Sequence, residues 1–503
     1  MKLNLNHTPL MVLGTSSGAG KTIIVTAICR YLKRKGEKPI PFKGQNMSNN
    51  AWVDSQGREM AYSQALQSWS AGLEPSAEMN PILLKPKGDS TSEIIHLGKS
   101  VGTSQAINYY EDWFYSGWET IKKGLAILLN NEKDGRLILE GAGSPVEVNL
   151  KHKDLTNLKL ARYLNADCIL VADIERGGVF AQIIGTIALM LPEEKQLIKG
   201  IIINRFRGDK ALFDSGVSWI EKETGIPVLG ILPWIQEIFP PEDSLDLLDK
   251  NQINQNADVE IAIMKLPRIS NFSDLDPFFS ESSIQIRWIE PGQDLGAPDV
   301  LIIPGSKQTI KDLDTLNKTG MSKQIKDYAK SGGTIFGICG GLQMLGKSLE
   351  DPYKKESINE KNTFSYLGMN LLPIKTTFGK IKNTSQREEI ISWPETKKIK
   401  GFEMHYGKSE LIRNNISDVI SLFKNNSLGW LFENKDKSFI GGTYLHGIFE
   451  NDEWRIQWIN KVRQKKGLSK LNQDKNNNHN KREQLLDLLT NSFEKNINMD
   501  KLI

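Results

Sequence analysis

Two short segments of this 503-residue chain hold residues whose types and spacing suit chemistry. One is a glycine-rich segment that ends in a lysine and a threonine, and the other is a cysteine set between glycines. The first segment consists of Gly14, Thr15, Ser16, Ser17, Gly18, Ala19, Gly20, Lys21 and Thr22. It follows a short apolar run and precedes a segment with helical periodicity, which Gly36 is expected to end.

The glycine-rich segment has the chemistry of a phosphate-binding loop. Glycines let the backbone approach phosphate oxygens closely, and the free N–H groups at a helix start attract anions. Lys21 adds a cation, and the hydroxyl of Thr22 suits Mg²⁺. The strict pattern would place a glycine at Thr15, so this is a variant P-loop. We expect it to bind ATP together with Mg²⁺.

A triphosphate site also needs an acid for its metal ion. Glu140 ends an apolar run, at the sheet edge where the loop would lie, so we expect it to bind the metal or position water. The alternative is an acid at a helix start. Asp54 is a further metal candidate and Glu59 a weaker one. Lys43 and Lys85 are predicted in loops that bind an anionic substrate, and solubilising surface lysines are the alternative.

The second segment is a nucleophile elbow. Gly337-Ile338-Cys339-Gly340-Gly341 follows an apolar run and leads into a helix-like segment. A nucleophile on a tight strand-to-helix turn needs small neighbours, and the helix start favours the thiolate. Cys339 is therefore the expected catalytic thiol. A buried, inert cysteine is the alternative.

A thiol nucleophile needs a base, an orienting acid and an oxyanion hole. His446 lies in the later run Gly-Thr-Tyr-Leu-His-Gly and is the expected base, with His405 as second choice or substrate contact. Glu450 is the acid that could orient the imidazole. The backbone N–H groups of Gly305 and Gly340 are the expected oxyanion donors.

The elements that must position these residues follow an α/β rhythm. Short apolar runs alternate with helix-like segments, as in a parallel sheet covered on both faces. In the first half the runs are 10–13, 136–140, 168–173, 200–204 and 227–232; in the second half they are 259–266, 299–303, 333–338 and 441–445.

A polar stretch at 240–258 separates the two series as a linker would. We predict an α/β domain with the phosphate-binding loop at 1–250, a second α/β domain with the cysteine elbow at 257–455, and a C-terminal segment at 456–503. Within that last segment, 465–482 is expected to be an exposed connection. Leu485, Leu486, Leu488, Leu489 and Phe493 then have helical spacing and predict a helix packed on the body of the protein.

The charge balance, the cysteine content and the apolar stretches indicate which kinds of partner and compartment to expect. Lysine plus arginine number 64 against 60 acids, a net charge of +4, which indicates neither nucleic acid nor an anionic membrane. Cys29, Cys168 and Cys339 are too few and too far apart for a disulfide framework, which favours a reducing compartment. No apolar stretch approaches the length of a membrane span. We expect a cytoplasmic protein, and self-association stays open.

A nucleotide site that can activate a carboxylate and a thiol site that can release ammonia from glutamine together suggest an amide ligase. The motifs resemble those of the cobyric acid synthase family, the glutamine-hydrolysing ligases of cobalamin biosynthesis. Beyond the two sites above, the resemblance is carried by the segments at residues 41–47, 79–86, 140–145, 172–180, 204–209, 266–272, 304–307 and 442–447.

The resemblance implies a dethiobiotin-synthetase-like ATPase domain followed by a class I glutamine amidotransferase domain. It implies Cys339 as the nucleophile with His446 as its partner, and it adds Asn204 to the nucleotide site. The substrates would be glutamine, ATP and the corrinoid adenosylcobyrinic acid a,c-diamide. Its b, d, e and g carboxylates would be amidated in turn through acyl phosphates.

Two alternatives stay open. The first is the sister enzyme, cobyrinic acid a,c-diamide synthase, which has both domains. The second is a P-loop ATPase switch carrying an inactive amidotransferase-like domain. Such switches place a signature lysine early in the loop, where this chain has Ser16, and this counts against the second alternative.

Overall fold

The strand that precedes the glycine loop lies in the middle of a six-stranded parallel sheet. The strand order is β12-β11-β10-β1-β9-β2. The strands are β1 (Leu10–Gly14), β2 (Pro39–Phe42), β9 (Arg136–Glu140), β10 (Asp167–Asp173), β11 (Ile198–Phe206) and β12 (Val228–Pro233). The computed structural model describes residues 5–88, 90–235, 257–356, 364–412, 419–425, 427–472 and 478–502.

Both faces of this sheet are covered because successive side chains of β1 point to opposite sides. Leu10 and Val12 belong to a core that includes residues of α1, whereas Met11 and Leu13 belong to a core that includes residues of α3, α4, α5 and α7. The helices of this unit are α1 (Lys21–Arg34), α2 (Tyr62–Ala71), α3 (Ala106–Asn131), α4 (Leu158–Leu164), α5 (Val179–Ala188), α6 (Pro192–Lys195) and α7 (Asp214–Thr224).

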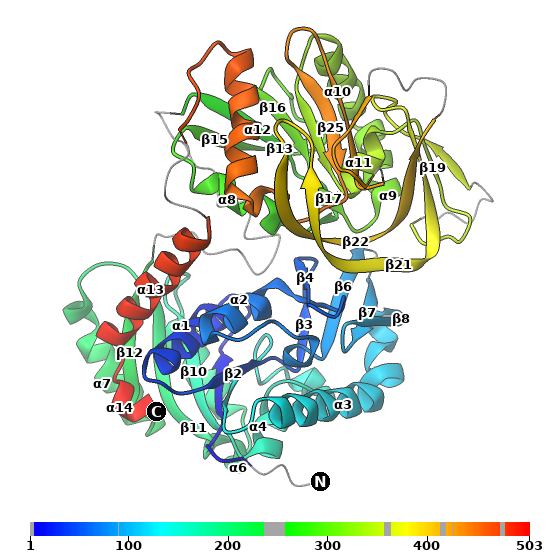
Figure 1. Ribbon diagram of the computed structural model, residues 1–503. Helices are drawn as coiled ribbons and strands as arrows, with labels where there is room; N and C mark the ends of the chain where they lie inside the picture. Colours follow the sequence, from blue (N-terminus) through cyan, green and yellow to red (C-terminus); the bar gives the residue numbers. More distant parts are fainter. Residues whose placement is uncertain are drawn as a thin grey trace.

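Short strands extend from the first unit toward the second (Figure 1). They form a mixed sheet of β3 (Gln45–Met47), β6 (Ile82–Gly88), β7 (Thr91–His96) and β8 (Lys99–Gln105), and a hairpin of β4 (Ala51–Val53) and β5 (Glu59–Ala61). Lys85 lies within β6 and is buried, so its predicted place in a loop was wrong.

The second unit has a seven-stranded sheet of order β15-β13-β16-β18-β25-β24-β23, in which β24 pairs antiparallel with both of its neighbours and the other pairings are parallel. The strands are β13 (Val259–Met264), β15 (Ile284–Ile289), β16 (Val300–Ile303), β18 (Ile335–Ile338), β23 (Val419–Ser421), β24 (Gly429–Glu433) and β25 (Phe439–Thr443). Its helices are α8 (Asp276–Phe279), α9 (Thr309–Lys318), α10 (Met321–Lys330), α11 (Gly340–Leu345) and α12 (Asp452–Lys465). The predicted apolar runs match parallel strands of both sheets, but they did not include β2 and β15, which are also parallel.

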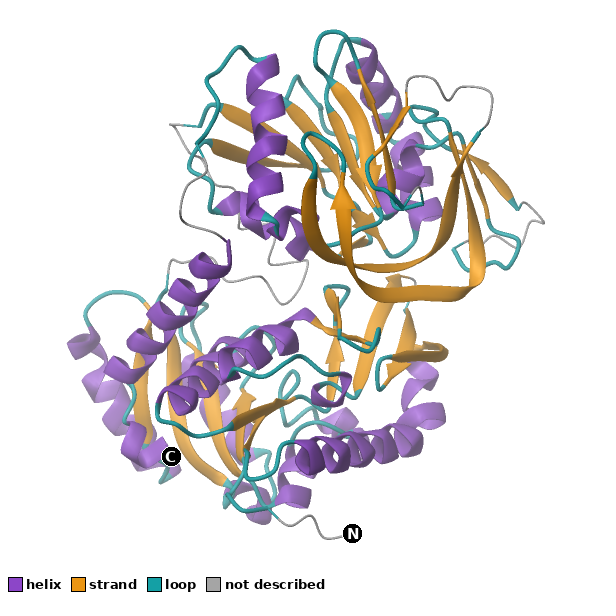
Figure 2. Cartoon of the chain, viewed as in Figure 1, coloured by secondary structure: helices purple, strands orange, loops and turns teal. Residues whose placement is uncertain are grey.

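A long hairpin of β21 (Ile374–Ile391) and β22 (Lys397–Leu411) curves along the side of the second unit that faces the first (Figures 1 and 2). It belongs to a small sheet with β19 (Ser348–Glu350) and β20 (Ser365–Leu367). Phe402 and Met404 of β22 share an apolar cluster with Ala51 and Val53 of β4. The hairpin therefore forms part of the contact surface between the two units.

The end of the chain returns to the first unit. Helix α13 (Asn478–Asn496) lies along α1, and α14 (Met499–Leu502) follows it (Figure 1). Leu489 and Phe493 are buried in the core that contains Ile24 of α1. Arg30 of α1 pairs with Asp487 at 2.7 Å. The predicted C-terminal helix is present, and Leu488 is its exposed apolar residue.

The structure describes only parts of the two predicted connections. Most of the polar stretch 240–258 lies outside the described residues, as do residues 473–477 of the connection predicted at 465–482. The end of that second connection, from Asn478 onward, is the start of α13 rather than a loop.

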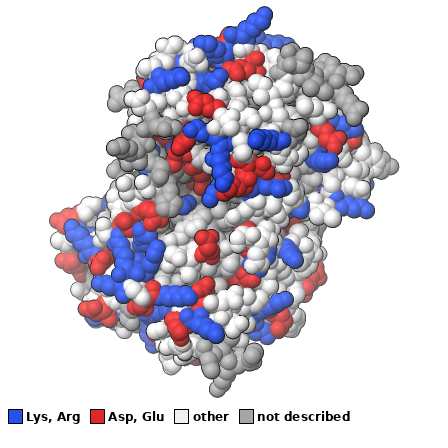
Figure 3. Space-filling model, viewed as in Figure 1, with Lys and Arg blue, Asp and Glu red and all other residues white. Residues whose placement is uncertain are grey.

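Charged side chains of both signs are interspersed on the face shown in Figure 3, as the small net charge suggests. Among the described residues, no helix has the length and apolar character needed to cross a membrane.

Candidate active site

The Cys339 elbow joins β18 to α11 with the backbone geometry of a strained turn. Cys339 has a φ of 49°, a left-handed conformation that costs free energy for a residue with a side chain. A Cβ at Gly337 would lie 2.5 Å from the Leu342 nitrogen, and one at Gly341 would lie 1.9 Å from the Ile303 carbonyl oxygen. Both glycines are therefore required by close backbone packing, and the predicted elbow is present.

His446 lies beside the thiol, three residues beyond the end of β25. It is buried, and it forms backbone hydrogen bonds with Phe402 of β22 in both directions. Its ring stacks on the Phe402 ring at a centroid distance of 5.3 Å. Cys339 and His446 line the same pocket, and the Cys339 side chain contributes to the raised pKa of the imidazole. The structure thus brings together the two residues that the sequence paired.

The third member of this group is Asp274, in a short helical turn at Phe272–Leu275. Its Oδ2 lies 2.7 Å from Nδ1 of His446, and its Oδ1 accepts the N–H of Gly447 at 2.7 Å. Asp274 holds the imidazole so that Nε2 is the nitrogen left for the thiol. Sequence reasoning missed this residue. It lies two residues beyond the segment 266–272, which carries part of the family resemblance, and no motif links it to the histidine.

The negative charge of Asp274 raises the proton affinity of the His446 imidazole. Burial alone would lower the pKa of its imidazole, but the Asp274 carboxylate and the Cys339 side chain raise that pKa to about 10. A histidine with this pKa holds its proton at neutral pH. The arrangement therefore places an imidazolium in the pocket of the Cys339 nucleophile, where it can serve as the proton donor of the thiol chemistry.

The predicted orienting acid and the second-choice base were wrong. Asp274, and not Glu450, bonds the His446 imidazole. Burial raises the pKa of Glu450. Both ring nitrogens of His405 face oxygen atoms, with Nδ1 2.7 Å from the Gly407 carbonyl and Nε2 2.9 Å from Glu403. His405 lines the thiol pocket, but its ring is held by β22 and not by the thiol.

The two glycines predicted as oxyanion donors lie at the elbow. A Cβ at Gly305 would lie 3.4 Å from Cε1 of His446, and one at Gly340 would lie 2.8 Å from the Ser306 nitrogen. Gly305 pairs with Ser270 in a two-residue antiparallel ladder. The backbone nitrogen that lies closest to the Cβ position of Gly340 is thus that of Ser306, the residue after Gly305. The roles of Gly305 and Gly340 as oxyanion donors stay a prediction.

The turn that carries Asp274 is anchored on the first unit. The Asn271 N–H donates to the Asn49 carbonyl at 3.1 Å, and the Ser273 hydroxyl donates to the Asn50 side chain at 2.8 Å. The pocket above Cys339 also includes Lys85 of β6 in its lining. The thiol site is thus built by residues of both units.

The glycine loop joins β1 to α1 as predicted. Lys21 curls back, and its Nζ bonds the carbonyl oxygens of Ser16 and Gly143 at 2.9 and 3.0 Å. Gly20 has a φ of 98°, and a Cβ there would lie 2.1 Å from the side-chain nitrogen of Asn204. That nitrogen donates to the Ala19 carbonyl at 2.9 Å. Asn204 therefore supports the loop from β11.

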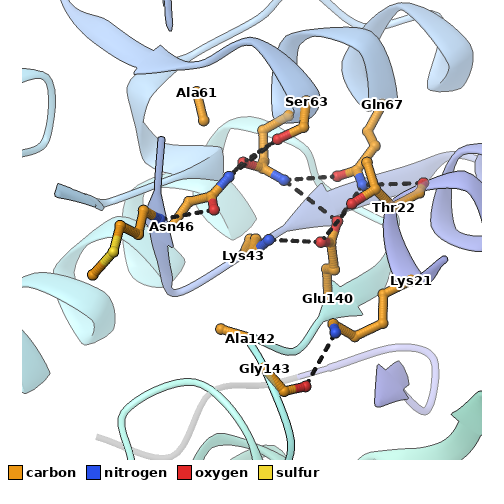
Figure 4. A network of polar contacts seen from close by, with 12 residues as sticks. Lys21, Thr22, Lys43, Asn46, Ala61, Ser63, Gln67, Glu140, Ala142 and Gly143 are labelled. Carbon is orange, nitrogen blue, oxygen red and sulfur yellow. Dashed lines mark hydrogen bonds and ion pairs between the residues drawn. The ribbon is translucent and has the colours of Figure 1, made fainter. Parts of the chain in front are cut away.

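Glu140 lies at the centre of a buried polar network at the start of α1 (Figure 4). It is fully buried, and its Oε1 lies 2.7 Å from Nζ of Lys43 and accepts the Thr22 hydroxyl at 2.9 Å. Gln67 of α2 donates to its Oε2. The predicted pair of Thr22 and Glu140 is therefore in contact, and Lys43 belongs with it.

The other two candidate metal ligands, Asp54 and Glu59, are bonded to groups other than Thr22 and Glu140. Asp54 accepts the backbone N–H groups of Gln56, Arg58 and Ala77 and pairs with the Arg58 guanidinium, so it shapes its own turn and does not join Thr22 and Glu140. Glu59 pairs with Lys85 at 3.1 Å and also contacts Lys382 of β21. The predictions of metal binding by Asp54 and Glu59 were wrong.

The remaining cysteines are core residues. Cys29 and Cys168 are fully buried, and burial raises the pKa of both thiols, that of Cys168 to about 12. These thiols are therefore protonated at neutral pH.

A P-loop unit joined to a unit with a Cys-His-Asp elbow defines a class of protein, the glutamine amidotransferases that carry their own nucleotide-binding domain. Residues 10–245 match the family described as the CobQ/CobB/MinD/ParA nucleotide binding domain. Residues 260–454 match the CobB/CobQ-like glutamine amidotransferase domain.

Full-length relatives narrow the class to one family. The chain is 81% identical over 503 residues to the cobyric acid synthase of Prochlorococcus marinus strain NATL2A, with 100% of both chains covered. It is 57% identical over 497 residues to that of strain MIT 9313, with 99% of both chains covered. The chain belongs to the cobyric acid synthase family.

Proposed function

We propose that the chain is an ATP- and glutamine-dependent ligase that amidates carboxylates of a corrinoid in cobalamin biosynthesis. The observation that carries this proposal is the presence of both half-sites in one chain, together with 81% identity to a cobyric acid synthase over the full length. The substrate is adenosylcobyrinic acid a,c-diamide. Its b, d, e and g carboxylates are amidated to give adenosylcobyric acid.

The thiol site releases ammonia from glutamine. The Cys339 sulfur attacks the side-chain amide carbon, and the carbon–nitrogen bond breaks as the His446 imidazolium gives its proton to the leaving nitrogen. The products are ammonia and a thioester. Water, deprotonated by the same imidazole, hydrolyses the thioester to glutamate and restores the thiol. Asp274 keeps the ring oriented through both steps.

The P-loop site binds ATP and activates the carboxylate. Backbone N–H groups of the glycine loop and the Lys21 ammonium face the phosphates, which draws Lys21 away from the Ser16 and Gly143 carbonyl oxygens. The carboxylate of the corrinoid takes the terminal phosphoryl group to form an acyl phosphate. Ammonia then displaces phosphate and leaves the amide.

Thr22 and Glu140 suit a magnesium ion that accompanies ATP. Mg²⁺ in such sites is bound by one or two protein oxygens together with phosphate oxygens, and the Thr22 hydroxyl and the Glu140 carboxylate already lie 2.9 Å apart. The ion would neutralise phosphate charge there. Lys43, which now pairs with Glu140 at 2.7 Å, is then available to an anionic group of the substrate.

The partners in this proposal are small molecules in the cytoplasm, and self-association is left open. The interspersed surface charge supports the absence of nucleic acid and membrane partners.

The direct test is to incubate the purified protein with glutamine, ATP, Mg²⁺ and the a,c-diamide corrinoid and to measure product mass. Each amidation replaces a hydroxyl with an amino group, so the mass should fall by one unit in four successive steps. Amidation of cobyrinic acid at its a and c carboxylates would instead identify the sister enzyme. ATP hydrolysis without any change in corrinoid mass would indicate an ATPase switch.

A further inference from the structure

Lys85 of the nucleotide-binding unit reaches into the thiol pocket of the amidotransferase unit. It is buried within β6, and it lines the same pocket as Cys339 and His446. Its Nζ lies 3.0 Å from the Met404 sulfur atom. The carbonyl oxygen of Met404 in turn lies 3.9 Å from the Cys339 sulfur atom. A cation from one unit therefore stands close to the nucleophile of the other.

This lysine belongs to a buried cluster that has one more cation than anions. The cluster joins the two units and consists of Glu59, Lys85, Glu93, Lys307 and Lys382. Lys307 pairs with Glu93, and Lys382 pairs with Glu59 at 2.5 Å. Tyr406 adds a hydrogen bond to Glu93.

Lys85 is the least compensated cation of the cluster. It shares Glu59 with Lys382 at the longer distance of 3.1 Å, and its other contact is the Met404 thioether, which carries no charge. Burial lowers the pKa of Lys85 to about 7, and the positive charges of Lys382 and Lys307 also lower it, against the pull of Glu59 and Glu93. An anion next to Lys85 would restore its charge and offset the desolvation of its ammonium group.

The ligand of this pocket brings such an anion. Glutamine must place its side-chain amide at Cys339, and three carbon atoms separate that amide carbon from the α-carboxylate. The same pocket holds the buried carboxylate of Glu356, whose pKa burial raises to about 7, and this group suits the α-ammonium. A corrinoid carboxylate has no ammonium beside it, so the paired charges match an amino acid better.

We propose that Lys85 of the nucleotide-binding unit binds the α-carboxylate of glutamine in the thiol pocket of the amidotransferase unit. The proposal rests on the proposed glutaminase half-reaction and adds a specificity residue to it from the other half of the chain. Its consequence is that the glutamine pocket is complete only where the two units touch. The structure of the first unit then sets the glutamine affinity of the second.

The test compares glutamine with L-glutamine α-amide, in which a neutral amide replaces the α-carboxylate, and measures ammonia release. The unaltered protein should prefer glutamine by about 100-fold or more in kcat/KM, as expected for one partner of a buried charge pair. Lys85→Met should lose about the same factor on glutamine, chiefly through KM. It should keep its activity on the α-amide, so that the preference disappears.

Two controls separate this role from others. Lys87→Met alters another lysine of β6, which does not line the described pocket, and it should keep the preference for glutamine. Lys85→Arg keeps the positive charge and should retain part of the preference. Amidation by Lys85→Met with ATP and ammonia should proceed with an unchanged KM for the corrinoid, which also shows that the variant folds.

Three results would overturn the proposal. Equal activity of the unaltered protein on both amides would show that the α-carboxylate is not recognised, without recourse to any variant. An equal loss of both activities in Lys85→Met would give Lys85 a structural role. A raised KM for the corrinoid in the ammonia assay would assign it to the corrinoid. Failure of the proposed function would differ, since the unaltered protein would then release ammonia from neither amide.

Discussion

The thiol site and the phosphate loop differ in how their charged groups are paired. At the thiol site His446 already pairs with Asp274 and lines the same pocket as Cys339. At the loop, Lys21 bonds two backbone carbonyl oxygens, and Lys43 bonds Glu140. The first site holds the contacts that its chemistry uses, whereas the second holds contacts that its ligands must replace.

This difference suggests a different source of control at each site. A preorganised triad needs only its substrate, so its rate depends on the position of glutamine. At the loop, ATP and its metal ion must exchange with the ion pair of Lys43 and Glu140, which are almost fully buried. ATP binding at the loop is therefore coupled to a rearrangement of charged side chains. Substitution of Glu140, Lys21 or Lys43 should then change the affinity for ATP as well as the rate of amidation. Substitutions at the two sites can test this contrast.

Cys339→Ser should have the largest effect on the glutamine half-reaction and little effect on the ATP half-reaction. A serine hydroxyl is far less ionised than a thiol at neutral pH, so glutamine-dependent amidation should fall by about a millionfold, to below detection. Amidation with ATP and a high concentration of ammonium salt at raised pH should continue. Both rates are measured from corrinoid mass.

Cys168→Ala is the matched control, since it removes a buried thiol of the other unit and should retain glutamine-dependent activity. If Cys339→Ser, while folded, also failed with ammonia, the two half-sites would not be separable as described.

Asp274→Asn should reduce glutaminase activity by about 10⁴-fold, because loss of an orienting carboxylate disturbs both the tautomer and the charge of the histidine. It should also lower the pKa of His446 from about 10 toward the ordinary 6.5. Steady-state kinetics and NMR titration of the ring measure the two effects. Glu450→Gln should change neither by a comparable amount, and the reverse result would restore Glu450 to the orienting role.

The same pair predicts a pH dependence of stability. His446 has a folded pKa above its unfolded value, so its protonation stabilises the fold. That contribution is complete below pH 6.5 and is lost as pH rises through about 10. The difference in unfolding free energy between the unaltered protein and Asp274→Asn should shrink over this range in denaturant titrations. A difference that is constant with pH would contradict the assigned ion pair.

Lys21→Ala should reduce amidation by about 10³-fold with either glutamine or ammonia, since it removes a cation that faces the phosphates in both reactions. Glutaminase activity should remain detectable. Lys35→Ala, at the exposed end of α1, is the control and should behave as the unaltered protein. Normal ammonia-dependent amidation by Lys21→Ala would remove the loop from the mechanism.

Glu140→Gln should have the smallest effect, expressed mainly in the Mg²⁺ requirement. An amide is a poorer ligand for Mg²⁺ than a carboxylate, so the half-saturating Mg²⁺ concentration should rise by about tenfold or more. Asp54→Asn should leave that concentration unchanged, because Asp54 is committed to its own turn. Equal titrations for the unaltered protein and Glu140→Gln would return Glu140 to a structural role.

The sequence predicted what is encoded locally. The strand Arg136–Glu140 was predicted with its observed bounds, because an apolar run between polar residues is a local signal. The elbow at Cys339 was found because its glycines are required by backbone contacts within a few residues and by the neighbouring strand. The loop at Gly14–Thr22 was found for the same kind of reason.

What the sequence did not reveal depends on contacts between distant segments. Asp274 and His446 are 172 residues apart, and no spacing rule joins them. Glu450 was preferred because it is near in sequence, although the orienting position belongs to whichever acid the fold brings there. Glu59 and Lys85 were seen as separate charges, because their ion pair joins two strands that are distant in sequence, and the pairing of Glu59 with Lys382 arises only where the two units meet.

The return of α13 to the first unit has a consequence for synthesis on the ribosome. Leu489, Phe493, Ile497 and Leu502 complete the core beside α1, yet the last strand of that sheet, β12, ends at Pro233. At roughly 5–20 residues per second, translation leaves this surface of α1 uncovered for tens of seconds after its sheet has emerged. The nascent first unit therefore exposes apolar side chains of α1 until residues 489–502 have left the exit tunnel. A chain that terminates before these residues cannot cover those side chains, so chaperones and proteases can recognise it.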